Sequence, residues 1–191
     1  MTTTPPTLGA ARLSPGAQVL PGEFVLKDGT PALIWPLLPT DARALREGFR
    51  RLSPGSRRRR FLTAVGELDD AMIRRLVDSV DGVQHIALVL IVLPPDGPEG
   101  PVGIARLVQY PADPATADIA VTVADNWQGR GVGTALVAAL MRRRPAALRR
   151  LRTVVDAGNR ASLALLAGAG HLSSGPPHLG VLDVTVDLTA A

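Results

Sequence analysis

The chain has no cysteine, a single lysine and only 3% aromatic residues among its 191 positions. The absence of cysteine excludes disulfide bonds, thiolate metal sites and a cysteine nucleophile. Because aromatic rings are scarce, we expect a hydrophobic core built from Leu, Val, Ile and Ala. The longest apolar run, Ile86–Leu93, is far too short to cross a bilayer, and Met1–Gly16 lacks the apolar stretch of a signal peptide. We therefore expect a cytoplasmic protein with no membrane partner.

The hydrophobic content of 46% and the charged fraction of 20% are typical of a soluble globular protein, and the length fits one domain. We expect residues 1–20 to form a flexible lead-in and residues 21–191 to form that domain. The net charge of +4 comes almost wholly from arginine, with clusters at Arg57–Arg60 and Arg142–Arg144. These clusters have no interleaved aromatic residues for base stacking. We interpret them as solvated helix faces and do not expect nucleic-acid binding.

Hydrophobic periodicity predicts a mixture of strands and helices. Strands are expected at Glu23–Lys27, Thr30–Leu37, His85–Leu93, Val102–Tyr110, Asp118–Val123, Leu151–Asp156 and Val181–Leu188. Helices are expected at Asp41–Leu52, Leu68–Val80, Gly131–Arg143 and Arg160–Ala169, with a short basic helical turn up to Phe61. The crossover from Asp118 to Asp156 makes its two strands parallel, whereas short loops join the preceding strands into an antiparallel meander. The sequence thus predicts an α/β fold with one mixed, mostly antiparallel twisted sheet flanked by helices.

Glycine occurs at every second position shortly after the strand that ends at Val123, at Gly129, Gly131 and Gly133. A strand that leads through a glycine-rich turn into a helix can hold phosphate, because backbone N–H groups and the helix dipole both face the anion. The segment is not a Rossmann fingerprint, which requires glycine where Thr134 stands. A Walker loop requires a lysine that this segment does not have.

Residues Gln128–Gly133 match the pattern Gln/Arg-x-x-Gly-x-Gly/Ala, so this loop resembles the pyrophosphate loop of the GNAT acyl-CoA-dependent N-acetyltransferases. Asn159–Leu166, followed by Gly170-His171, is similar to a second segment of that family. Further matches resemble its bacterial protein-lysine acetyltransferase (Pat-like) branch: Asp28-Gly29-Thr30, Leu52-Ser53-Pro54 with Ser56, Arg60-Phe61, and Val80-Asp81 with His85-Ile86-Ala87-Leu88. Together these matches cover most of residues 22–188.

The resemblance implies a GNAT fold in which the two parallel strands separate and hold the pantetheine arm of acetyl-CoA, the co-substrate, without a metal. It implies that backbone groups of Val121 and Val123 pair with this arm, and that Asn159 and Ser162 border it. The implied binding residues are Val121, Val123, Gln128, Gly129, Arg130, Gly131, Val132, Gly133, Thr134, Asn159 and Ser162. A backbone N–H of this strand would also stabilise negative charge that develops on the thioester oxygen.

An acceptor amine must be deprotonated before it attacks a thioester, and a lysine amine has a solution pKa of about 10.4. Pat-like enzymes carry a catalytic glutamate in an Ala-Glu-x-Ala-Val setting, where this chain has Ala117-Asp118-Ile119-Ala120-Val121. Asp118 is therefore the candidate base, with His85 as a weaker alternative. The family's Ile-Arg-Pro is Ile34-Trp35-Pro36 here, and Leu166 and His171 stand where many members have a general-acid tyrosine and a phenylalanine. Without that tyrosine, the leaving thiolate would take its proton from water or leave as the anion.

The leading hypothesis is an enzyme that transfers an acetyl group from acetyl-CoA to a primary amine by direct attack, with a protein lysine as the acceptor. A small amine or a protein N-terminus is the alternative acceptor. The alternative function is a weak or inactive module that binds or senses acyl-CoA, because Asp118 is one methylene shorter than glutamate and the tyrosine is absent. The sequence leaves open which acyl group is carried and whether the chain forms a homodimer.

Overall fold

The computed structural model describes residues 22–63, 65–93 and 100–188. The lead-in expected over residues 1–20 lies outside the described residues, and so do residues 94–99, between the strands expected at His85–Leu93 and Val102–Tyr110. In the part of the chain that is described, no helix is both long enough and apolar enough to span a membrane.

The chain forms a mixture of strands and helices, as the periodicity predicts. The strands are β1 (Gly22–Val25), β2 (Pro31–Pro36), β3 (His85–Val92), β4 (Gly100–Tyr110), β5 (Asp113–Val123), β6 (Arg150–Asp156), β7 (His171–Ser174) and β8 (Val181–Asp187). The helices are α1 (Ala42–Arg50), α2 (Pro54–Phe61), α3 (Asp70–Val77), α4 (Val132–Arg143) and α5 (Arg160–Ala167), with short 3-10 turns η1 (Pro39–Asp41) and η2 (Asp125–Trp127).

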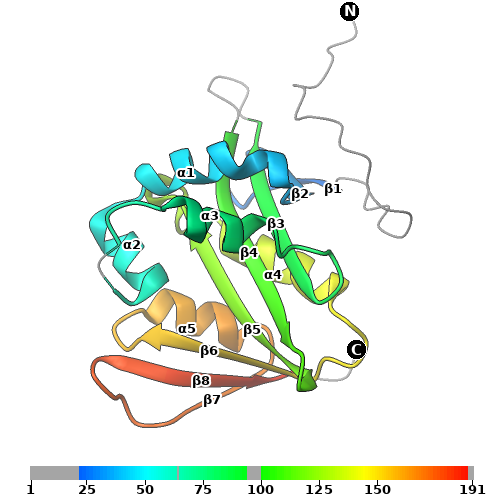
Figure 1. The fold of residues 1–191 in the computed structure, drawn as a ribbon, viewed down its shortest axis with the longest axis vertical. Coiled ribbons are helices and arrows are strands. Elements are labelled where there is room, and N and C mark those ends of the chain that lie inside the picture. The colour runs from blue at the N-terminus through cyan, green and yellow to red at the C-terminus, as the bar shows by residue number, and fades with distance from the viewer. Residues whose placement is uncertain (1–21, 64, 94–99, 189–191) are drawn as a thin grey trace, which may run out of the picture.

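The eight strands form one open sheet in the order β1-β2-β3-β4-β5-β6-β8-β7 (Figure 1). Among the described strands, β5 and β6 are the one parallel pair, and all other neighbours are antiparallel. The helical crossover through α4 makes β6 run in the same direction as β5. The predicted α/β fold with one mixed, mostly antiparallel sheet is confirmed.

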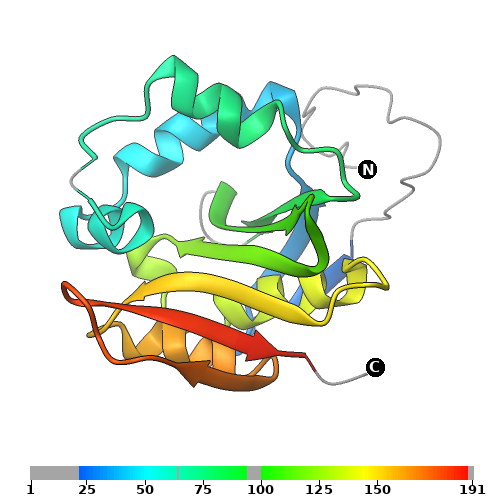
Figure 2. The same cartoon turned by 60° about the horizontal axis from the view of Figure 1, so that its bottom comes forward.

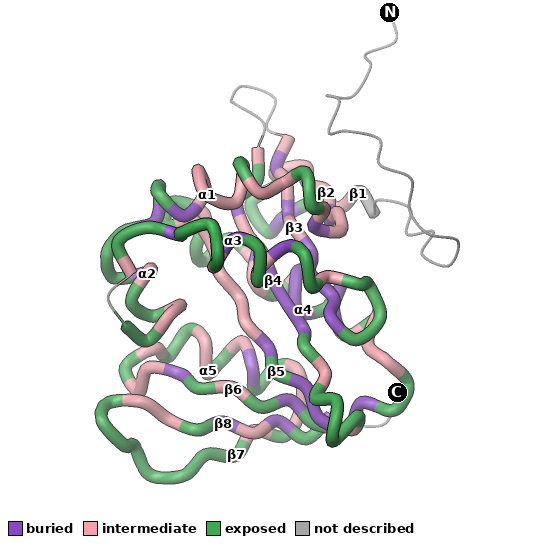
Figure 3. Tube along the Cα trace, in the orientation of Figure 1, coloured by how far each residue is buried: buried purple, intermediate pink, exposed green. Residues whose placement is uncertain are grey.

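Helices cover both faces of the sheet, with α1 and α3 on one face and α4 and α5 on the other, while α2 lies beside β5 (Figure 2). The α1–α3 face packs around Leu37, Phe49, Ile73 and Val77, and the α4 face contains the larger cluster of buried Leu, Val, Ile and Ala. Because both of its faces are covered, β3 is an almost continuously buried apolar strand. Figure 3 shows that burial is concentrated in β3, β4 and α4, whereas β7 is mostly exposed.

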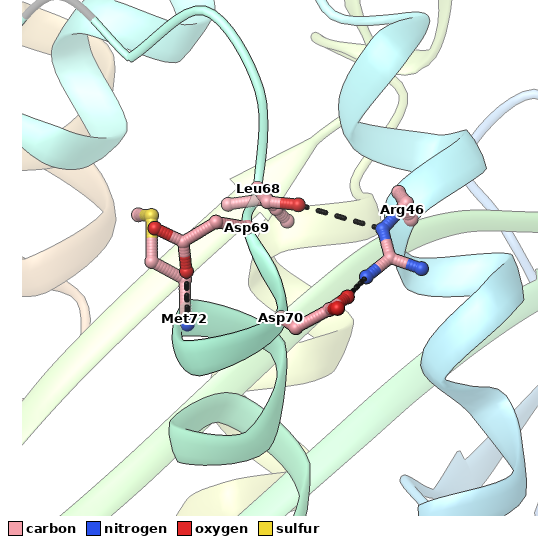
Figure 4. Close-up of polar contacts among 5 residues, drawn as sticks. All are labelled: Arg46, Leu68, Asp69, Asp70 and Met72. Carbon is pink, nitrogen blue, oxygen red and sulfur yellow. Dashed lines mark hydrogen bonds and ion pairs between the residues drawn. The ribbon is translucent and has the colours of Figure 1, made fainter.

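A polar link joins α1 to α3 above the sheet (Figure 4). Arg46 of α1 forms an ion pair with Asp70, with 2.6 Å between Nη2 and Oδ1, and its Nε donates to the Leu68 carbonyl at 3.4 Å. Asp69 caps α3 by accepting the Met72 N–H at 2.7 Å. The two helices therefore form one cover over this face of the sheet.

The bounds of most strands lie within two residues of the prediction, and the largest differences concern β5 and β7. β5 begins at Asp113 instead of Asp118, because its first residues, which have weak strand propensity, pair with the end of β4 as far as Tyr110. The four-residue strand β7 has no alternating apolar pattern and is largely polar. It exists because β8 offers a free edge, on which His171 pairs with Asp187. Both the early start of β5 and the presence of β7 depend on pairing with a neighbouring strand. A local sequence pattern cannot show such pairing.

Candidate active site

The segment after η2 enters α4 through glycines with left-handed backbone. Gly129 has φ +77° and Gly131 has φ +91°, values that other residues rarely adopt. Glycine is needed at position 133 for a different reason, because a Cβ there would lie 3.2 Å from Cδ2 of Leu165. Two glycines therefore shape the loop, and the third allows α4 to pack closely against α5.

The backbone N–H groups of residues 129–134 donate to no acceptor within the described part of the chain. The first N–H groups of a helix have no partner in the helix itself, and the helix dipole adds positive potential at this end. Together these features suit a phosphate group. Residues 128–134 are called the phosphate loop below.

The β1–β2 hairpin lies against the phosphate loop. The Lys27 N–H donates to the Arg130 carbonyl at 3.3 Å. The Arg130 guanidinium pairs with Asp28 at 3.1 Å and lies 4.6 Å from the centre of the Trp127 ring. The side chain of Lys27 passes Gly131, with its Cγ 3.1 Å from the place a Cβ would occupy. Arg130 is thus held by contacts within the protein, and Lys27, which no sequence motif singles out, brings a second cation to the loop.

β5 and β6 pair only near their beginnings. The parallel register joins Thr116 to Arg150 and ends where Asp118 meets Arg152. Beyond that point a cleft of about 320 Å³ opens between β5, β6 and α5. The cleft is lined by Arg59, Arg60, Phe61, Leu62, Asp118, Ile119, Ala120, Val121, Thr153, Val154, Val155, Asn159, Ser162, Leu165 and Leu166. The separation of the parallel strands that the resemblance implies is therefore present in the structure.

The backbone of β5 is open towards this cleft at Val121 and Val123. The Ala124 N–H donates to the Val102 carbonyl on β4, and successive residues of a strand present their backbone groups to opposite sides. The N–H groups of Val121 and Val123 must therefore point away from β4, towards the cleft. The Val123 carbonyl accepts the Gln128 side-chain amide at 3.2 Å. Val121 keeps both of its backbone groups on the open side of the strand.

The opposite wall of the cleft is the start of α5. Asn159 caps this helix, because its Oδ1 accepts the Ser162 N–H at 3.1 Å. Both residues also line the cleft. Asn159 can therefore cap the helix and also border the pantetheine arm, as the resemblance implies. Leu166, at the position of the family's tyrosine, lies in the same wall and provides no proton donor.

Asp118 is the one carboxylate among the described residues that line the cleft. Desolvation by the cleft walls raises the pKa of Asp118, although the positive charge of Arg60 and the Ile119 N–H act in the opposite direction. Burial lowers the pKa of Arg60, and Asp118 opposes that shift. A cleft carboxylate with a raised pKa is a stronger proton acceptor than an ordinary aspartate.

His85 is held in a closed hydrogen-bond chain on the sheet. Nη2 of Arg106 lies 2.6 Å from Nε2 of His85, and because a guanidinium can only donate, Nε2 must accept. Nδ1 then carries the proton and donates to Ser79 Oγ at 2.9 Å, and that hydroxyl donates to the Arg75 carbonyl at 2.8 Å. Burial and the charge of Arg106 lower the pKa of His85. The geometry gives His85 no free nitrogen with which to take a proton from a substrate.

Asp125 connects the turn before the phosphate loop to α2. Its carboxylate accepts the Ser53 N–H and hydroxyl, both at 2.8 Å, and the Ser56 hydroxyl at 2.7 Å. Desolvation would raise the pKa of Asp125, but the hydrogen bonds from Ser56 and Ser53 outweigh it and lower the pKa. The Gln128 side-chain amide adds a longer contact to Ser56 at 3.3 Å. The helix that carries Arg60 is thereby held to the phosphate loop.

We expect Asp125→Ala to lower the free energy of unfolding by about 1–3 kcal/mol, because the buried Ser56 hydroxyl and the start of α2 lose a charged acceptor. Urea unfolding at pH 7 measures this loss. Asp113→Ala is the matched control, since Asp113 accepts a single exposed N–H, from Ala115 at 3.2 Å. An equal loss in both variants would contradict the stabilising role of Asp125.

Comparison with known proteins shows the family of this fold and site. Residues 67–170 match the model of the acetyltransferase (GNAT) family. The chain is 34% identical over 155 residues to Acetyltransferase PA5475 of Pseudomonas aeruginosa, covering 80% of this chain and 81% of that protein. The chain therefore belongs to the GNAT acetyltransferase family. It is an acyl-CoA-dependent N-acetyltransferase, as the sequence resemblance implies.

Solved structures agree with this assignment. The GNAT domain of S. lividans PAT superimposes with a TM-score of 0.73 at 26% identity, covering 88% of this chain and 97% of that chain. A cAMP-binding acyltransferase from Mycobacterium smegmatis has a TM-score of 0.58 at 23% identity, covering 90% of this chain and 48% of that chain. The second likeness concerns the fold alone and about half of the larger protein.

Proposed function

We propose that the β5–β6 cleft holds the acyl end of acetyl-CoA while the phosphate loop binds its pyrophosphate. The contact that carries this proposal joins the two regions, because Gly133 of the loop packs against Leu165 of the cleft wall. The proposed binding residues are Val121, Val123, Gln128, Gly129, Arg130, Gly131, Val132, Gly133, Thr134, Asn159 and Ser162, and we add Lys27. Most of them would act through the backbone, with Gln128 and Arg130 shaping the loop through the contacts described above.

In the proposed reaction the acceptor amine attacks the thioester carbon directly. The N–C bond forms, the C–S bond breaks, and Asp118 takes a proton from the amine, directly or through a water molecule. The Val121 N–H stabilises the charge that develops on the carbonyl oxygen. Since Leu166 provides no proton, the coenzyme A thiolate takes its proton from water or leaves as the anion. The alternative function is a weak or inactive module that binds acyl-CoA. Observed transfer of the acetyl group to an acceptor would exclude that alternative.

The acceptor is a primary amine. The resemblance to Pat-like domains favours a protein lysine, and a cavity described below favours a small acceptor. The proposal treats residues 21–191 as one acyltransferase domain and keeps the cytoplasmic location expected from the sequence. A homodimer is not required by the site, because the described residues of one chain supply both walls of the cleft.

We expect acetyl-CoA to raise the melting temperature of the protein. A ligand that binds only the folded state, at about 100 times its Kd, stabilises it by about 2.7 kcal/mol, which is roughly 5–10 °C for a domain of this size. Differential scanning fluorimetry measures the shift. Pantetheine, which lacks the phosphates, is the control and should give a much smaller shift. No shift at millimolar acetyl-CoA would exclude the proposed binding.

A further inference from the structure

A second cavity, of about 160 Å³, lies between the sheet and the cover formed by α1 and α3. Its walls are mainly apolar and include Leu45, Phe49, Leu68, Val89 and Ile104. Arg60 and Phe61 of α2 line both this cavity and the β5–β6 cleft. The cavity therefore adjoins the cleft at the residue whose charge acts on Asp118. The site described above makes no use of this space.

Arg106 is a buried cation on the wall of this cavity, with only 5% of its surface exposed. Its Nη2 donates to the neutral imidazole of His85, which brings no negative charge. Its Nη1 is buried and has no hydrogen-bond partner among the described residues. No ion pair joins Arg106 to a carboxylate in the described part of the chain. An uncompensated buried charge is strongly unfavourable, and a carboxylate would compensate it with charge-assisted hydrogen bonds.

The sheet register places Arg106 beside the reaction centre. Arg106 on β4 is directly opposite Ala120 on β5. Asp118 lies two residues along β5 from Ala120, so all three side chains share one face of the sheet. Burial, followed by the nearby charge of Arg60, lowers the pKa of Arg106 to about 10, so the guanidinium remains charged at neutral pH.

Among the described residues that line the cavity, Asp41 is the one carboxylate. Asp41 lies before α1, beside β2, two strands away from Arg106 on β4. Its Oδ2 accepts the Leu38 N–H at 2.9 Å, and its Oδ1 is buried without a partner among the described residues. The end of the cavity next to the cleft therefore carries the two guanidinium groups of Arg60 and Arg106, and the other end carries a single carboxylate.

We propose that this cavity is the acceptor site, in which Arg106, together with Arg60, binds a carboxylate carried by the acceptor while an apolar side chain occupies the space beneath α1. The acceptor that fits is a free amino acid with an apolar side chain, whose amine projects into the cleft towards Asp118. This inference rests on the proposed function and narrows its acceptor. The transfer step is unchanged: the amine loses a proton to Asp118 as the new N–C bond forms.

Pairs of acceptors that differ only at the carboxylate test this inference with the unaltered full chain. L-leucine, L-methionine and L-phenylalanine are compared with their carboxamides, and release of free coenzyme A from acetyl-CoA is measured. We expect kcat/KM to be at least tenfold higher for the acids, mainly through KM. The amine of each carboxamide loses its proton more easily than the amine of the corresponding acid, and this difference by itself would favour the carboxamide. A higher kcat/KM for the acid must therefore come from recognition of the carboxylate. Lysine-containing peptides are assayed in parallel.

Acids that react no better than their carboxamides, or a failure of every amino acid to react, would overturn the inference. Turnover of lysine peptides alone would overturn it and leave the proposed acetyl transfer intact. If the proposed function itself were wrong, the outcome would differ from these, because acetyl-CoA would not raise the melting temperature.

Substitution of Arg106 provides a second test. Arg106→Met should remove the preference for acids over carboxamides while the thermal shift with acetyl-CoA remains. Arg58→Met, at an exposed arginine of α2 that lines neither the cavity nor the cleft, is the control and should keep the preference. A preference that survives in folded Arg106→Met would contradict the role of Arg106. If that variant does not fold, the acid and carboxamide comparison in the unaltered protein decides the question by itself.

Discussion

Gly131→Glu is expected to weaken acetyl-CoA binding by roughly 100-fold or more, which corresponds to ~2.8 kcal/mol or more. The glutamate would bring a carboxylate to the helix end whose free N–H groups suit an anion. The new side chain would also crowd Lys27, whose Cγ lies 3.1 Å from the position of the new Cβ. Isothermal titration calorimetry with acetyl-CoA measures the loss directly, and the thermal shift should disappear with it.

A matched variant separates this effect from backbone strain. Gly131 has φ +91° and Gly82 has φ +75°, so a glutamate at either position costs about 1–2 kcal/mol of stability in the left-handed region. Gly82 precedes β3, at the opposite end of the sheet from the phosphate loop, and has open space around it. Gly82→Glu should therefore destabilise the protein and still bind acetyl-CoA. Normal binding by a folded Gly131→Glu variant would show that the phosphate loop is not the pyrophosphate site.

Asp118→Asn is expected to lower kcat by about 10²–10⁴-fold, the usual contribution of a general base. The amide has nearly the same shape but cannot take the amine's proton, so the affinity for acetyl-CoA should not change. Asp113→Asn is the control, at the exposed start of the same strand, and should keep full activity. Asp118→Glu should also remain active, because it restores the carboxylate that Pat-like enzymes carry. Undiminished turnover by Asp118→Asn would exclude Asp118 as the base.

If Asp118 is the base, it also determines how the activity of the unaltered enzyme depends on pH. Desolvation by the cleft walls raises the pKa of Asp118 above its ordinary value. The base is active only when ionised, so kcat/KM should fall as the pH falls through this raised pKa. In the Asp118→Asn variant this acidic limb should be absent from the residual activity. A profile that keeps the same limb would assign it to another group.

The phosphate loop could be predicted because its requirements are local. Left-handed backbone at Gly129 and Gly131 depends on the residues themselves, and the apolar pattern after them starts the helix wherever the rest of the chain lies. The parallel pairing of β5 and β6 also follows from the sequence, because a helical crossover between two strands leaves little choice of direction. Asp118 could be chosen from its position in a family-like motif, but its place on the cleft wall and its raised pKa could not be predicted from the sequence.

The tertiary structure decided which side chains meet. Lys27 reaches Gly131 because a hairpin far away in the sequence lies against the loop. Arg106 shares a face with Asp118 through the register of β4 on β5, and its side-chain partner among the described residues is the neutral His85 of β3 instead of a carboxylate. Local patterns determine backbone conformation and strand direction. Contacts between distant segments, and the burial and charge that follow from them, depend on how the whole sheet assembles.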